Sequence, residues 1–532
     1  MGTYLNPGNE GFAEMRDEYY RDKTGLIALI NDRINKTNKL TCISRPRRFG
    51  KSFAAKMLCA YYDHACDSHG LFEDLEIAKA ASYEKHLNKY NVIYLDMSNL
   101  LGKVAPEGLV KFIEDNVELE LLSIPDANIE KGTSFDQTLI RAVEKTGRKF
   151  IMIIDEWDAP IRETPEISKE YLRFLRMLFK SSATTAKIFA AAYMTGILPI
   201  KKDGTQSAIS DFREFPILNP GEFAEYTGFT EKDVRELCAE YNMDFDEMKR
   251  WYDGYSFDNV VSIYNPFSVI SAIEKREVES YWKQTSIAEP LLEFIQKHLS
   301  LINGQKSELQ EDIIKLIAGE HLKVNVTKFK NDFQSLRTED DVLTLFIHLG
   351  YLVYDKTTKR VRIPNEEVRL EFHELIEEAE TSELTQLTKL VSDSENLLKA
   401  TLKQDGTTVA DTIKHIRETN YAPTHYNNEQ SLRYAVKFAY IVCVDYYLKV
   451  EELPSGKGMA DIVYLPRVDS ALPAMVIELK WKETAESAIG QIKKRDYPAI
   501  LTDYYGEIIL VGINYDSSTN EHTCVIEKHE KK

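Results

Sequence analysis

Short apolar runs alternate with helical patterns over the first 200 residues. Runs typical of buried strands cover Leu40 to Ile43, Val92 to Asp96, Phe150 to Asp155 and Ile188 to Thr195, and the pattern of Phe53 to Tyr62 predicts a helix. Apolar strands separated by helices are typical of a parallel sheet covered on both faces. This part of the chain therefore predicts an α/β fold.

The middle of the chain has a different pattern. From about residue 221 to residue 297 it is helical and acidic, and residues 340–364 predict a helix followed by strands at 349–354 and 360–363. A helix followed by a hairpin resembles a winged-helix module. The stretch from residue 371 to about residue 407 predicts an acidic helical connector.

The last 120 residues predict a second α/β domain with its own order of elements. A helix at 428–447 precedes strands at 449–453, 460–465 and 474–481, and then come a helix at 485–502 and strands at 508–515 and 523–528. At 532 residues the chain is too long for a single core, so two to four domains are expected.

Composition and charge narrow the class of protein. The six cysteines lack CxxC spacing, which argues against a zinc site and a disulfide framework. No signal-peptide pattern and no membrane-length apolar run is present, so we expect a cytoplasmic enzyme without membrane association. The net charge of −18 is unusual for a nucleic-acid enzyme, but a local basic set stands near the C-terminus: Lys480, Lys482, Lys493, Lys494 and Arg495. That set is equally consistent with a solvated helix face.

A phosphate-binding loop is predicted between the first strand and the following helix, at Arg45-Pro-Arg-Arg-Phe-Gly-Lys-Ser52. Backbone N–H groups and the start of the helix would surround the phosphates, Lys51 would reach the β- and γ-phosphates, and Ser52 would bind Mg²⁺. Arg45 stands where the usual pattern has glycine, and a turn that needs glycine would be strained there. The residues expected to contact the nucleotide are Arg47, Arg48, Phe49, Gly50, Lys51 and Ser52.

A second motif supports the nucleotide site. The apolar run from Phe150 ends in Asp155 and Glu156. Asp155 would hold the Mg²⁺ through water, and Glu156 would orient and deprotonate the attacking water. Thr195, at the end of a neighbouring strand, would sense the γ-phosphate, although a structural strand-end threonine is nearly as good an interpretation.

A second candidate site lies near the C-terminus. Asp461 and Glu478 each sit on a short apolar strand, and Lys480 shares a strand face with Glu478 because strand side chains repeat every two residues. Hard divalent cations prefer carboxylate oxygen, so Asp461 and Glu478 are expected to bind Mg²⁺ or Mn²⁺. Lys480 would stabilise the transition state of phosphodiester hydrolysis or position the attacking water.

These motifs together resemble a known family, the AAA-ATPase-like proteins with a C-terminal PD-(D/E)XK nuclease domain. The matching pieces are Phe12 to Arg16, Tyr20 to Thr24, Ser44 to Ser52, Ile154 to Pro160, Thr195 to Leu198, Trp251 to Tyr255, Tyr264 to Phe267, Leu349 to Leu352 and Ile363 to Glu366. The family carries the same Arg-Pro-Arg-Arg run in its phosphate loop. Arg21 departs from the hydrophobic residue usual at its position.

The resemblance implies a fold and further site residues. It implies an α/β protein with a P-loop, additional-strand ATPase core, a parallel sheet, a helical lid and a winged-helix-like region, plus an α/β PD-(D/E)XK nuclease domain. In the nuclease domain it implies that Glu429 lies near the metals and that Gln491, with Tyr497, belongs to the site. Both Glu429 and Gln491 fit equally well as ordinary helix-surface residues.

The predicted domains are the ATPase core at 1–220, the helical lid at 221–300, the winged-helix-like region at 301–385, the connector at 386–410 and the nuclease-like domain at 411–532. The leading hypothesis is an ATP-hydrolysing, metal-dependent nuclease that uses ATP and Mg²⁺ or Mn²⁺. It would act on nucleic acid, DNA in preference to RNA, in defence or mobile-element biology, and a homo-oligomer is left open.

Two rival hypotheses remain. One is a nucleotide-driven switch that keeps an inactive nuclease-like domain as a binding platform. The other is a signalling ATPase whose nuclease is released only by a trigger. The intact set of Asp461, Glu478 and Lys480 favours an enzyme over a platform, but no sequence feature separates the third hypothesis from the first.

Overall fold

Five parallel strands form the sheet of the N-terminal part of the chain. In the computed structural model they run in the order β2 (Asn91–Asp96), β3 (Phe150–Asp155), β4 (Phe189–Gly196), β1 (Leu40–Ser44) and β5 (Arg213–Phe215). β4 thus lies between the strand that precedes the phosphate loop and the strand that ends in Asp155. This is the additional strand of the predicted ATPase core, so the fold class is confirmed.

The structure describes residues 2–16, 19–124, 127–180, 182–200, 209, 211–257, 260–282, 312–313, 315–316, 319–327, 329, 336, 338–378, 393–420, 428–455, 458–466, 472–495 and 506–529. The chain divides into two compact units. One is Met1–Thr285 with Lys323–Leu370, and the other is Ser286–Leu322 with Glu371–Lys532. The finer predicted domain boundaries stay predictions.

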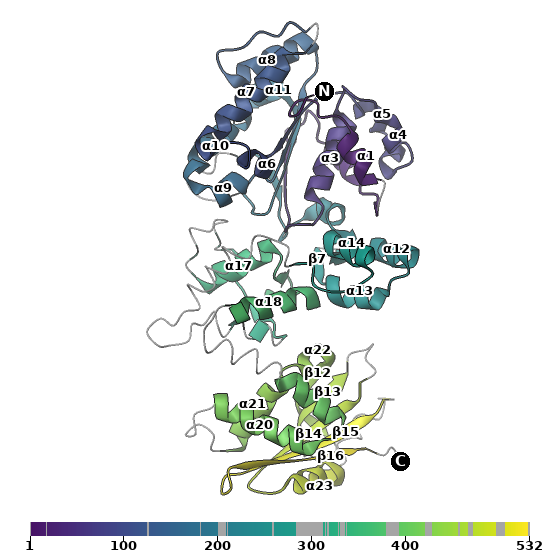
Figure 1. Cartoon of the computed structure of the whole chain (residues 1–532), viewed down its shortest axis with the longest axis vertical. Helices are drawn as coiled ribbons and strands as arrows, with labels where there is room; N and C mark the ends of the chain where they lie inside the picture. Colours follow the sequence, from purple (N-terminus) through teal and green to yellow (C-terminus); the bar gives the residue numbers. More distant parts are fainter. Residues whose placement is uncertain are drawn as a thin grey trace. The chain divides into compact units, whose positions relative to one another are not determined.

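Helices cover both faces of the parallel sheet (Figure 1). α1 (Glu10–Arg16), α2 (Gly25–Asn31) and α3 (Lys51–Tyr62) lie on one face, where they share a buried core with Ile43 and Ile153. α7 (Leu109–Leu122), α8 (Phe135–Thr146), α10 (Ser168–Phe179) and α11 (Ser182–Ile188) cover the other, against Cys42 and Met152. Neighbouring residues of each strand thus face opposite cores, which explains the unbroken apolar runs.

Short elements complete this sheet domain. The helices are α4 (His69–Phe72), α5 (Tyr83–His86), α6 (Met97–Leu101) and α9 (Ala159–Glu163), and the 3₁₀ turns are Glu76–Lys79, Pro106–Gly108, Pro165–Ile167 and Gly221–Tyr226. No helix of the described residues is both long and apolar enough to span a lipid bilayer.

The sequence pattern predicted that the region after the parallel sheet is helical. The structure shows that it also contains short strands. Helices α12 (Glu231–Tyr241), α13 (Phe245–Tyr252) and α14 (Pro266–Lys275) accompany a sheet of β6 (Phe229–Thr230), β8 (Val260–Tyr264) and β7 (Tyr255–Phe257). These strands have only two to five residues, too few for a recognisable alternation. α17 (Glu339–Leu349), β10 (Val353–Asp355) and β11 (Arg360–Arg362) form the predicted helix and hairpin, with β9 (Leu322–Lys323) beside β11 and α18 (Glu366–Glu378) following.

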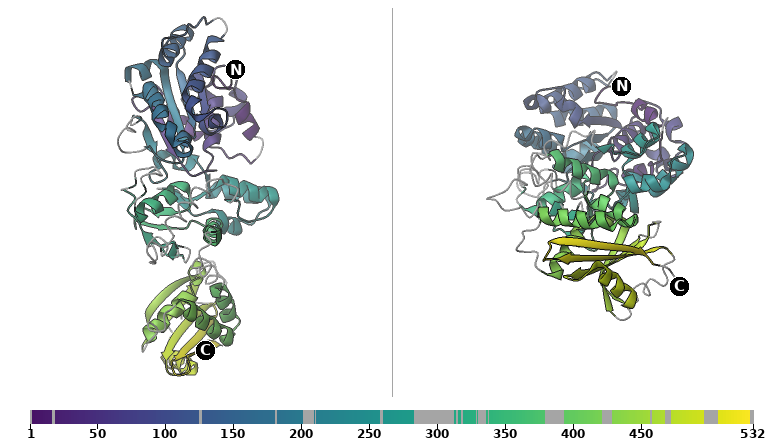
Figure 2. Two further views of the ribbon diagram at one scale, coloured as in Figure 1. Left: turned by 60° about the vertical axis from the view of Figure 1, so that its left-hand side comes forward. Right: turned by 60° about the horizontal axis from the view of Figure 1, so that its bottom comes forward.

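The C-terminal domain is a mixed sheet between helices (Figure 2). The strand order is β12 (Tyr447–Ser455), β13 (Gly458–Pro466), β14 (Ala474–Trp481), β15 (Ile508–Asp516) and β16 (Glu521–Lys528). β14 and β15 are parallel, and α23 (Ala485–Arg495) connects them, whereas the other pairs are antiparallel. α20 (Gly406–Asn420) and α21 (Glu429–Ala439) pack on one face, and α23 packs on the other.

Two predicted helices of this domain differ from the structure. The helix predicted at 428–447 is two helices, because α21 ends at Ala439 and is followed by α22 (Cys443–Tyr446). β12 already begins at Tyr447, whose side chain is buried against Tyr464. α23 ends at Arg495, and the rest of the helix predicted to 502 lies outside the described residues.

Candidate functional site

The phosphate loop joins β1 to α3 and turns at two left-handed residues. Gly50 (φ +79°) directly precedes α3, and Arg48 has φ +66°. Arg45, which replaces the usual glycine, is not among the residues of positive φ. The strain that a side chain would cause at that position therefore does not arise.

The side chain of Arg45 holds the start of the phosphate loop in place through buried contacts. Its side chain is fully buried. The guanidinium donates to Thr227 Oγ1 at 2.9 Å, to the carbonyl of Ser44 at 2.9 Å and to that of Phe215 at 2.6 Å. It also lies 5.2 Å from the ring centroid of Phe257. A guanidinium suits this place because it offers five donors in a fixed plane.

The rest of the loop is tied to the elements that follow the sheet. Arg48 lies 3.8 Å above the Phe267 ring of α14 and donates to the carbonyl of Tyr281 at 2.9 Å. The N–H of Tyr281 in turn donates to the carboxylate of Glu367 in α18 at 2.9 Å. Phe49 is fully buried with its ring edge-on to Tyr255, at 5.0 Å. The loop is thus connected through Arg48 to α14 and α18.

Lys51 is buried at the start of α3. Its Nζ donates to the carbonyls of Arg45 and Pro46 at 3.2 and 2.8 Å. Burial lowers the pKa of Lys51, while Glu156 and Asp155 act in the opposite direction. The lysine is therefore held inside the loop, under the influence of Asp155, which ends β3, and of Glu156, which follows it.

Asp155 lies at the centre of the predicted site, at the end of β3. Its carboxylate accepts hydrogen bonds from the hydroxyls of Thr195, on β4, and Ser52. Burial raises the pKa of Asp155, and both hydroxyls and Lys51 counteract that rise. The structure thus brings together Lys51, Ser52, Asp155 and Thr195 from three different elements.

Glu156 follows with a left-handed backbone (φ +52°). Its carboxylate accepts hydrogen bonds from Ser98 Oγ and from Arg162 Nη2, each at 3.1 Å. Although burial opposes it, the charges of Lys51, Arg162 and Arg47 hold the pKa of Glu156 below its usual value. The carboxylate is therefore kept ionised, as a base that activates water would have to be.

Arg162 links Glu156 to the segment after β4. Its Nε donates to Asp158 Oδ2 at 2.9 Å, and Asp158 accepts the backbone N–H groups of Ile197 and Leu198 at 3.2 and 2.9 Å. A Cβ on Gly196 would lie 2.6 Å from Trp157 and 2.7 Å from Asp158. Glycine is therefore required where β4 meets this network.

A pocket of about 660 Å³ opens over the phosphate loop. Of the predicted residues, Arg48, Phe49, Gly50, Lys51, Ser52 and Glu156 line it. Arg47 does not line it; its Nη2 lies 3.8 Å from Glu163 and its charge also acts on Glu156. Asp155 and Thr195 adjoin the pocket through Ser52. The motifs did not identify the further aromatic residues that line the pocket, although three of them, Phe12, Tyr20 and Phe267, lie within the quoted family segments. These aromatic residues are Phe12, Tyr19, Tyr20, Phe53, Tyr226, Phe229 and Phe267.

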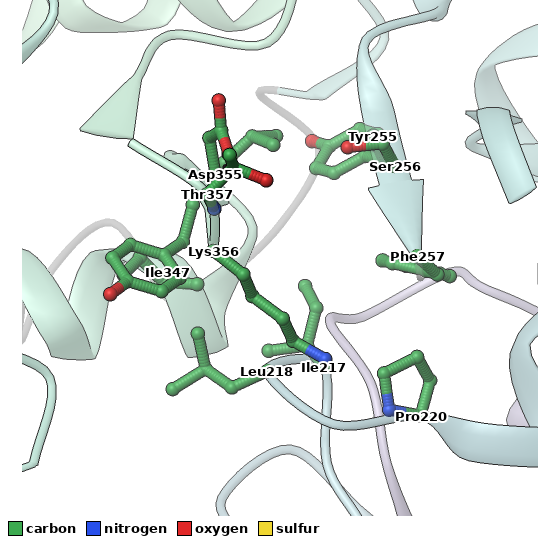
Figure 3. Close-up of a pocket in the computed structure, with 12 residues that line it drawn as sticks. Ile217, Leu218, Pro220, Tyr255, Ser256, Phe257, Ile347, Asp355, Lys356 and Thr357 are labelled. Atoms are coloured by element: carbon green, nitrogen blue, oxygen red, sulfur yellow. Dashed lines mark hydrogen bonds between the residues drawn. The ribbon is translucent and has the colours of Figure 1, made fainter. Parts of the chain in front are cut away.

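A second pocket, of about 150 Å³, lies in the part of the chain that follows the parallel sheet (Figure 3). It is enclosed by the 217–220 segment, β7, α17 and the turn after β10, and the Lys356 side chain extends across it toward Ile217. None of the predicted site residues lines this pocket.

The C-terminal candidates meet at the junction of β13 and β14. Ile462 pairs with Ile477, so Asp461 and Glu478 occupy the next position on each strand. Asp461 Oδ2 accepts the N–H of Leu479 at 2.8 Å. Glu478 accepts from the amide of Gln491 on α23, and Lys480 Nζ donates to Gln491 Oε1 at 2.8 Å and lies 3.7 Å from Glu478 Oε1. The structure thus brings Asp461, Glu478, Lys480 and Gln491 together.

Glu429 does not join this group. It is exposed at the first residue of α21, whereas Arg433, one turn later, forms an ion pair with Asp461. Among the residues that the structure describes, no cluster of three or more His, Cys, Asp or Glu side chains is arranged to hold a metal ion. Tyr497 lies outside the described residues, and the role of Glu429 stays a prediction.

The donor atoms at both sites are of the kind that Mg²⁺ and Mn²⁺ prefer. Ser52 and Asp155 offer a hydroxyl and a carboxylate beside the phosphate loop, and Asp461 and Glu478 offer two nearly buried carboxylates. Hard oxygen donors of this type fit a divalent cation. At the C-terminal site, Asp461 and Glu478 are the residues that would hold it.

Two family models match the two parts of the chain. Residues 7–206 match the family described as a predicted AAA-ATPase. Residues 427–524 match the PD-(D/E)XK nuclease superfamily. The chain therefore combines an AAA-ATPase-like domain with a domain of the PD-(D/E)XK nuclease superfamily, and the family predicted from the motifs is confirmed.

Individual relatives are distant. An uncharacterised protein encoded in the vnfD 5′ region of Azotobacter chroococcum mcd 1 is 24% identical over 390 residues, which is 69% of each chain. A signal transduction ATPase with a tetratricopeptide repeat sensor from Pyrococcus horikoshii is 13% identical with a TM-score of 0.27, over 80% of this chain and about half (52%) of that one. The Aeropyrum pernix ORC2 protein is 10% identical with a TM-score of 0.28, over 68% of this chain and 94% of that one.

Proposed function

We propose that this protein hydrolyses ATP and uses a metal-dependent nuclease domain to cleave nucleic acid under the control of the bound nucleotide. The observation that carries the proposal is that each domain brings most of its predicted reactive groups together. Lys51, Ser52, Asp155, Glu156 and Thr195 meet at the phosphate loop, and Asp461, Glu478 and Lys480 meet at the edge of β13 and β14.

At the phosphate loop, each group has a role that its position supports. Lys51 would exchange the carbonyls of Arg45 and Pro46 for phosphate oxygens, and Ser52 and Asp155 would hold Mg²⁺, which neutralises charge on the phosphates. Glu156 would accept a proton from the attacking water. Thr195 touches both Asp155 and the N–H of Glu156, at 3.3 Å for the latter, so it would transmit the state of the γ-phosphate to both.

At the C-terminal site, a bound divalent cation would supply Lewis-acid polarisation of the scissile phosphate and a more acidic water. Asp461 and Glu478 would hold it. Gln491 bridges Lys480 and Glu478 and so fixes the lysine beside the carboxylates. Lys480 would offset negative charge that develops on the phosphate.

Control by ATP is supported by the connection of the phosphate loop to α18. Arg48 reaches Tyr281, Tyr281 reaches Glu367, and Ser268 of α14 donates to the same carboxylate at 3.0 Å. Glu367 is fully buried, and α18 precedes the nuclease domain in the sequence. A change in Arg48 on nucleotide binding would therefore act on the start of that helix.

We further propose that the protein acts on DNA in preference to RNA, in the cytoplasm, and that its role lies in defence or mobile-element biology.

A second function is favoured by a specific observation. Asp461 is paired with Arg433, Glu478 is held by Gln491 and Lys480, and no third acidic ligand joins them among the described residues. This would suit a nucleotide-driven switch whose nuclease-like domain only binds a partner.

One experiment separates the two functions. The purified protein is incubated with plasmid, linear single-stranded DNA and RNA, with Mg²⁺ or Mn²⁺, and with or without ATP, and the products are resolved by electrophoresis. The Asp461→Ala variant serves as the control for contaminating nucleases. Cleavage by the wild type that the variant lacks supports the nuclease. ATP hydrolysis without cleavage under any condition supports the switch.

A further inference from the structure

We infer that two residues outside the nucleotide pocket, Gly350 and Tyr255, position the phosphate loop for ATP. The inference rests on the proposed ATPase function, and it makes the end of α17 and the strand β7 part of the nucleotide site. Neither residue lines the pocket over the loop. Both lie in segments that carried the family resemblance, 251–255 and 349–352, to which the motifs gave no role at the site.

Gly350 lies directly against Pro46 of the phosphate loop. It follows α17 in the left-handed conformation (φ +91°), and the turn is closed by a hydrogen bond from the N–H of Tyr351 to the carbonyl of Phe346 at 2.9 Å. The left-handed backbone alone favours glycine at the end of a helix. The surroundings add a second reason, because a Cβ built on Gly350 would lie 2.8 Å from Cβ and 3.0 Å from Cγ of Pro46.

Tyr255 connects the same glycine to a second residue of the loop. Its hydroxyl donates to the carbonyl of Gly350 at 2.6 Å, and its ring lies edge-on to Phe49, with the ring centroids 5.0 Å apart. The side chains of Tyr255 and Phe49 are both fully buried. Because a buried hydroxyl that loses its partner costs free energy, Tyr255 is held between Gly350 and Phe49.

Pro46 and Phe49 stand next to the groups that would bind phosphate. The carbonyl of Pro46 accepts a hydrogen bond from Lys51 Nζ at 2.8 Å, so a shift of Pro46 moves an anchor of the lysine. Phe49 directly precedes Gly50, which has φ +79° and opens α3. The two contacts therefore act on Lys51 and on the backbone N–H groups at the start of α3, which are expected to surround the phosphates.

The packing at this place would transmit a displacement to the loop backbone. A methyl group on Gly350 would meet Pro46 on one side and Trp282, at 3.2 Å, on another. The ring of a proline is closed onto its own backbone nitrogen, so Pro46 cannot rotate away as a flexible side chain would. A well-packed interior has no free volume to take up the added atom. The phosphate loop itself must therefore shift.

The test compares Gly350→Ala with a matched variant of a second glycine. Gly147 also follows a helix, α8, in the left-handed conformation (φ +68°), and no heavy atom lies within 4 Å of the place that its Cβ would take. Alanine should therefore strain the backbone at both positions. Only at Gly350 should it also displace the phosphate loop.

ATP affinity is measured on the full chain with a fluorescent ATP analogue, and thermal melting without nucleotide verifies that each protein is folded. We expect Gly350→Ala to bind the analogue about tenfold more weakly than the wild type, because the groups that hold the phosphates are misplaced. Gly147→Ala should bind it normally, although its melting temperature falls as well. Tyr255→Phe keeps the ring beside Phe49 but lacks the hydroxyl, and it should bind about threefold more weakly.

A double variant isolates the contact between the two loops. Pro46→Gly removes the ring that the new Cβ would meet. Gly350→Ala should therefore weaken binding much less in the Pro46→Gly background than in the wild type. Equal effects of Gly350→Ala in both backgrounds would show that Pro46 does not carry the displacement, and would overturn the inference.

The remaining outcomes separate this inference from the proposed function. A folded Gly350→Ala protein with wild-type affinity, or equal losses of affinity in Gly350→Ala and Gly147→Ala, would overturn the inference while the ATPase stands. If Gly350→Ala does not fold, Tyr255→Phe decides, and wild-type affinity in that variant would contradict the positioning role. A wild type that binds no ATP would overturn both the inference and the proposed function.

Discussion

Lys51 donates a hydrogen bond from Nζ to the backbone carbonyl of Pro46 at 2.8 Å, five residues earlier in the same loop. Together with the bond to the carbonyl of Arg45, this places the ammonium group in the concave side of the loop, where burial lowers its pKa. These carbonyls are neutral acceptors, whereas the phosphates of ATP would give the ammonium group a negatively charged partner.

The first prediction concerns this lysine. Lys51→Ala should weaken ATP binding at least about 100-fold, because it removes charge-assisted hydrogen bonds to phosphate. Binding is measured with a fluorescent ATP analogue. Lys56→Ala, on the same helix but outside the pocket lining, should bind normally. Similar affinities for the two variants would contradict the assignment of Lys51.

A second prediction separates binding from chemistry at Glu156. Glu156→Gln should bind ATP normally, but its rate of ATP hydrolysis should fall by a factor of about 100 or more, because an amide cannot accept the proton from water. Arg162→Ala should also reduce kcat with little effect on KM, since Arg162 positions Glu156 at 3.1 Å without lining the pocket. Steady-state phosphate release provides both constants. Wild-type turnover by Glu156→Gln would rule out its role as the base.

The third prediction concerns the unusual loop residue Arg45. Replacing it with glycine restores the common phosphate-loop pattern, yet it should destabilise the protein by about 3 kcal/mol or more, because Thr227 and two carbonyls lose a buried partner. Arg45→Lys should be intermediate, as one ammonium cannot reach all three groups. Thermal melting measures the effect. An Arg45→Gly protein as stable as the wild type would show that the anchor has no structural role.

Most of the secondary structure could be predicted from the sequence, and the elements that could not be predicted have a physical reason in common. The strand Phe150–Asp155 and the strand Ala474–Trp481 have the predicted bounds, since a buried strand with both faces covered reads as an unbroken apolar run. The short strands β6, β7 and β8 could not be recognised, because two to five residues carry too little periodicity.

The residues of the candidate sites also divide into those that the sequence predicts and those that it does not. Residues that share a strand, such as Glu478 and Lys480, or that follow one another directly, such as Asp155 and Glu156, can be grouped from the sequence. Arg433 could not be found in this way, because it meets Asp461 only through the packing of α21 on the sheet. For Arg45, the sequence signals a departure from the pattern but not the buried partners that make arginine suitable.

The fourth prediction is a pH dependence of the C-terminal domain. His522 on β16 has its pKa lowered from 6.5 to about 3, chiefly by burial and further by Arg417 and Lys414. Between those pH values an unfolded chain binds a proton that the folded His522 does not, so this group makes stability fall as the pH drops. The slope should be at most about 1.4 kcal/mol per pH unit.

The measurement is thermal or urea unfolding of the wild type and of His522→Phe between pH 7.5 and about 4.5. Phenylalanine keeps an aromatic ring beside Tyr515, whose ring centroid is 4.8 Å away, but it cannot titrate. The variant should therefore lose less stability on acidification. Parallel pH profiles for the two proteins would show that His522 is not the group responsible.

The central claim, that ATP controls a metal-dependent nuclease in one chain, is tested most directly by the rate of DNA cleavage with Mn²⁺ in the presence and absence of ATP. The wild type, Lys51→Ala and Asp461→Ala are measured under the same conditions. We expect the rate of the wild type to change with ATP, the rate of Lys51→Ala to be insensitive to ATP, and Asp461→Ala to be inactive in both conditions. Equal rates for the wild type and Asp461→Ala, or a wild-type rate that ATP leaves unchanged, would contradict the claim.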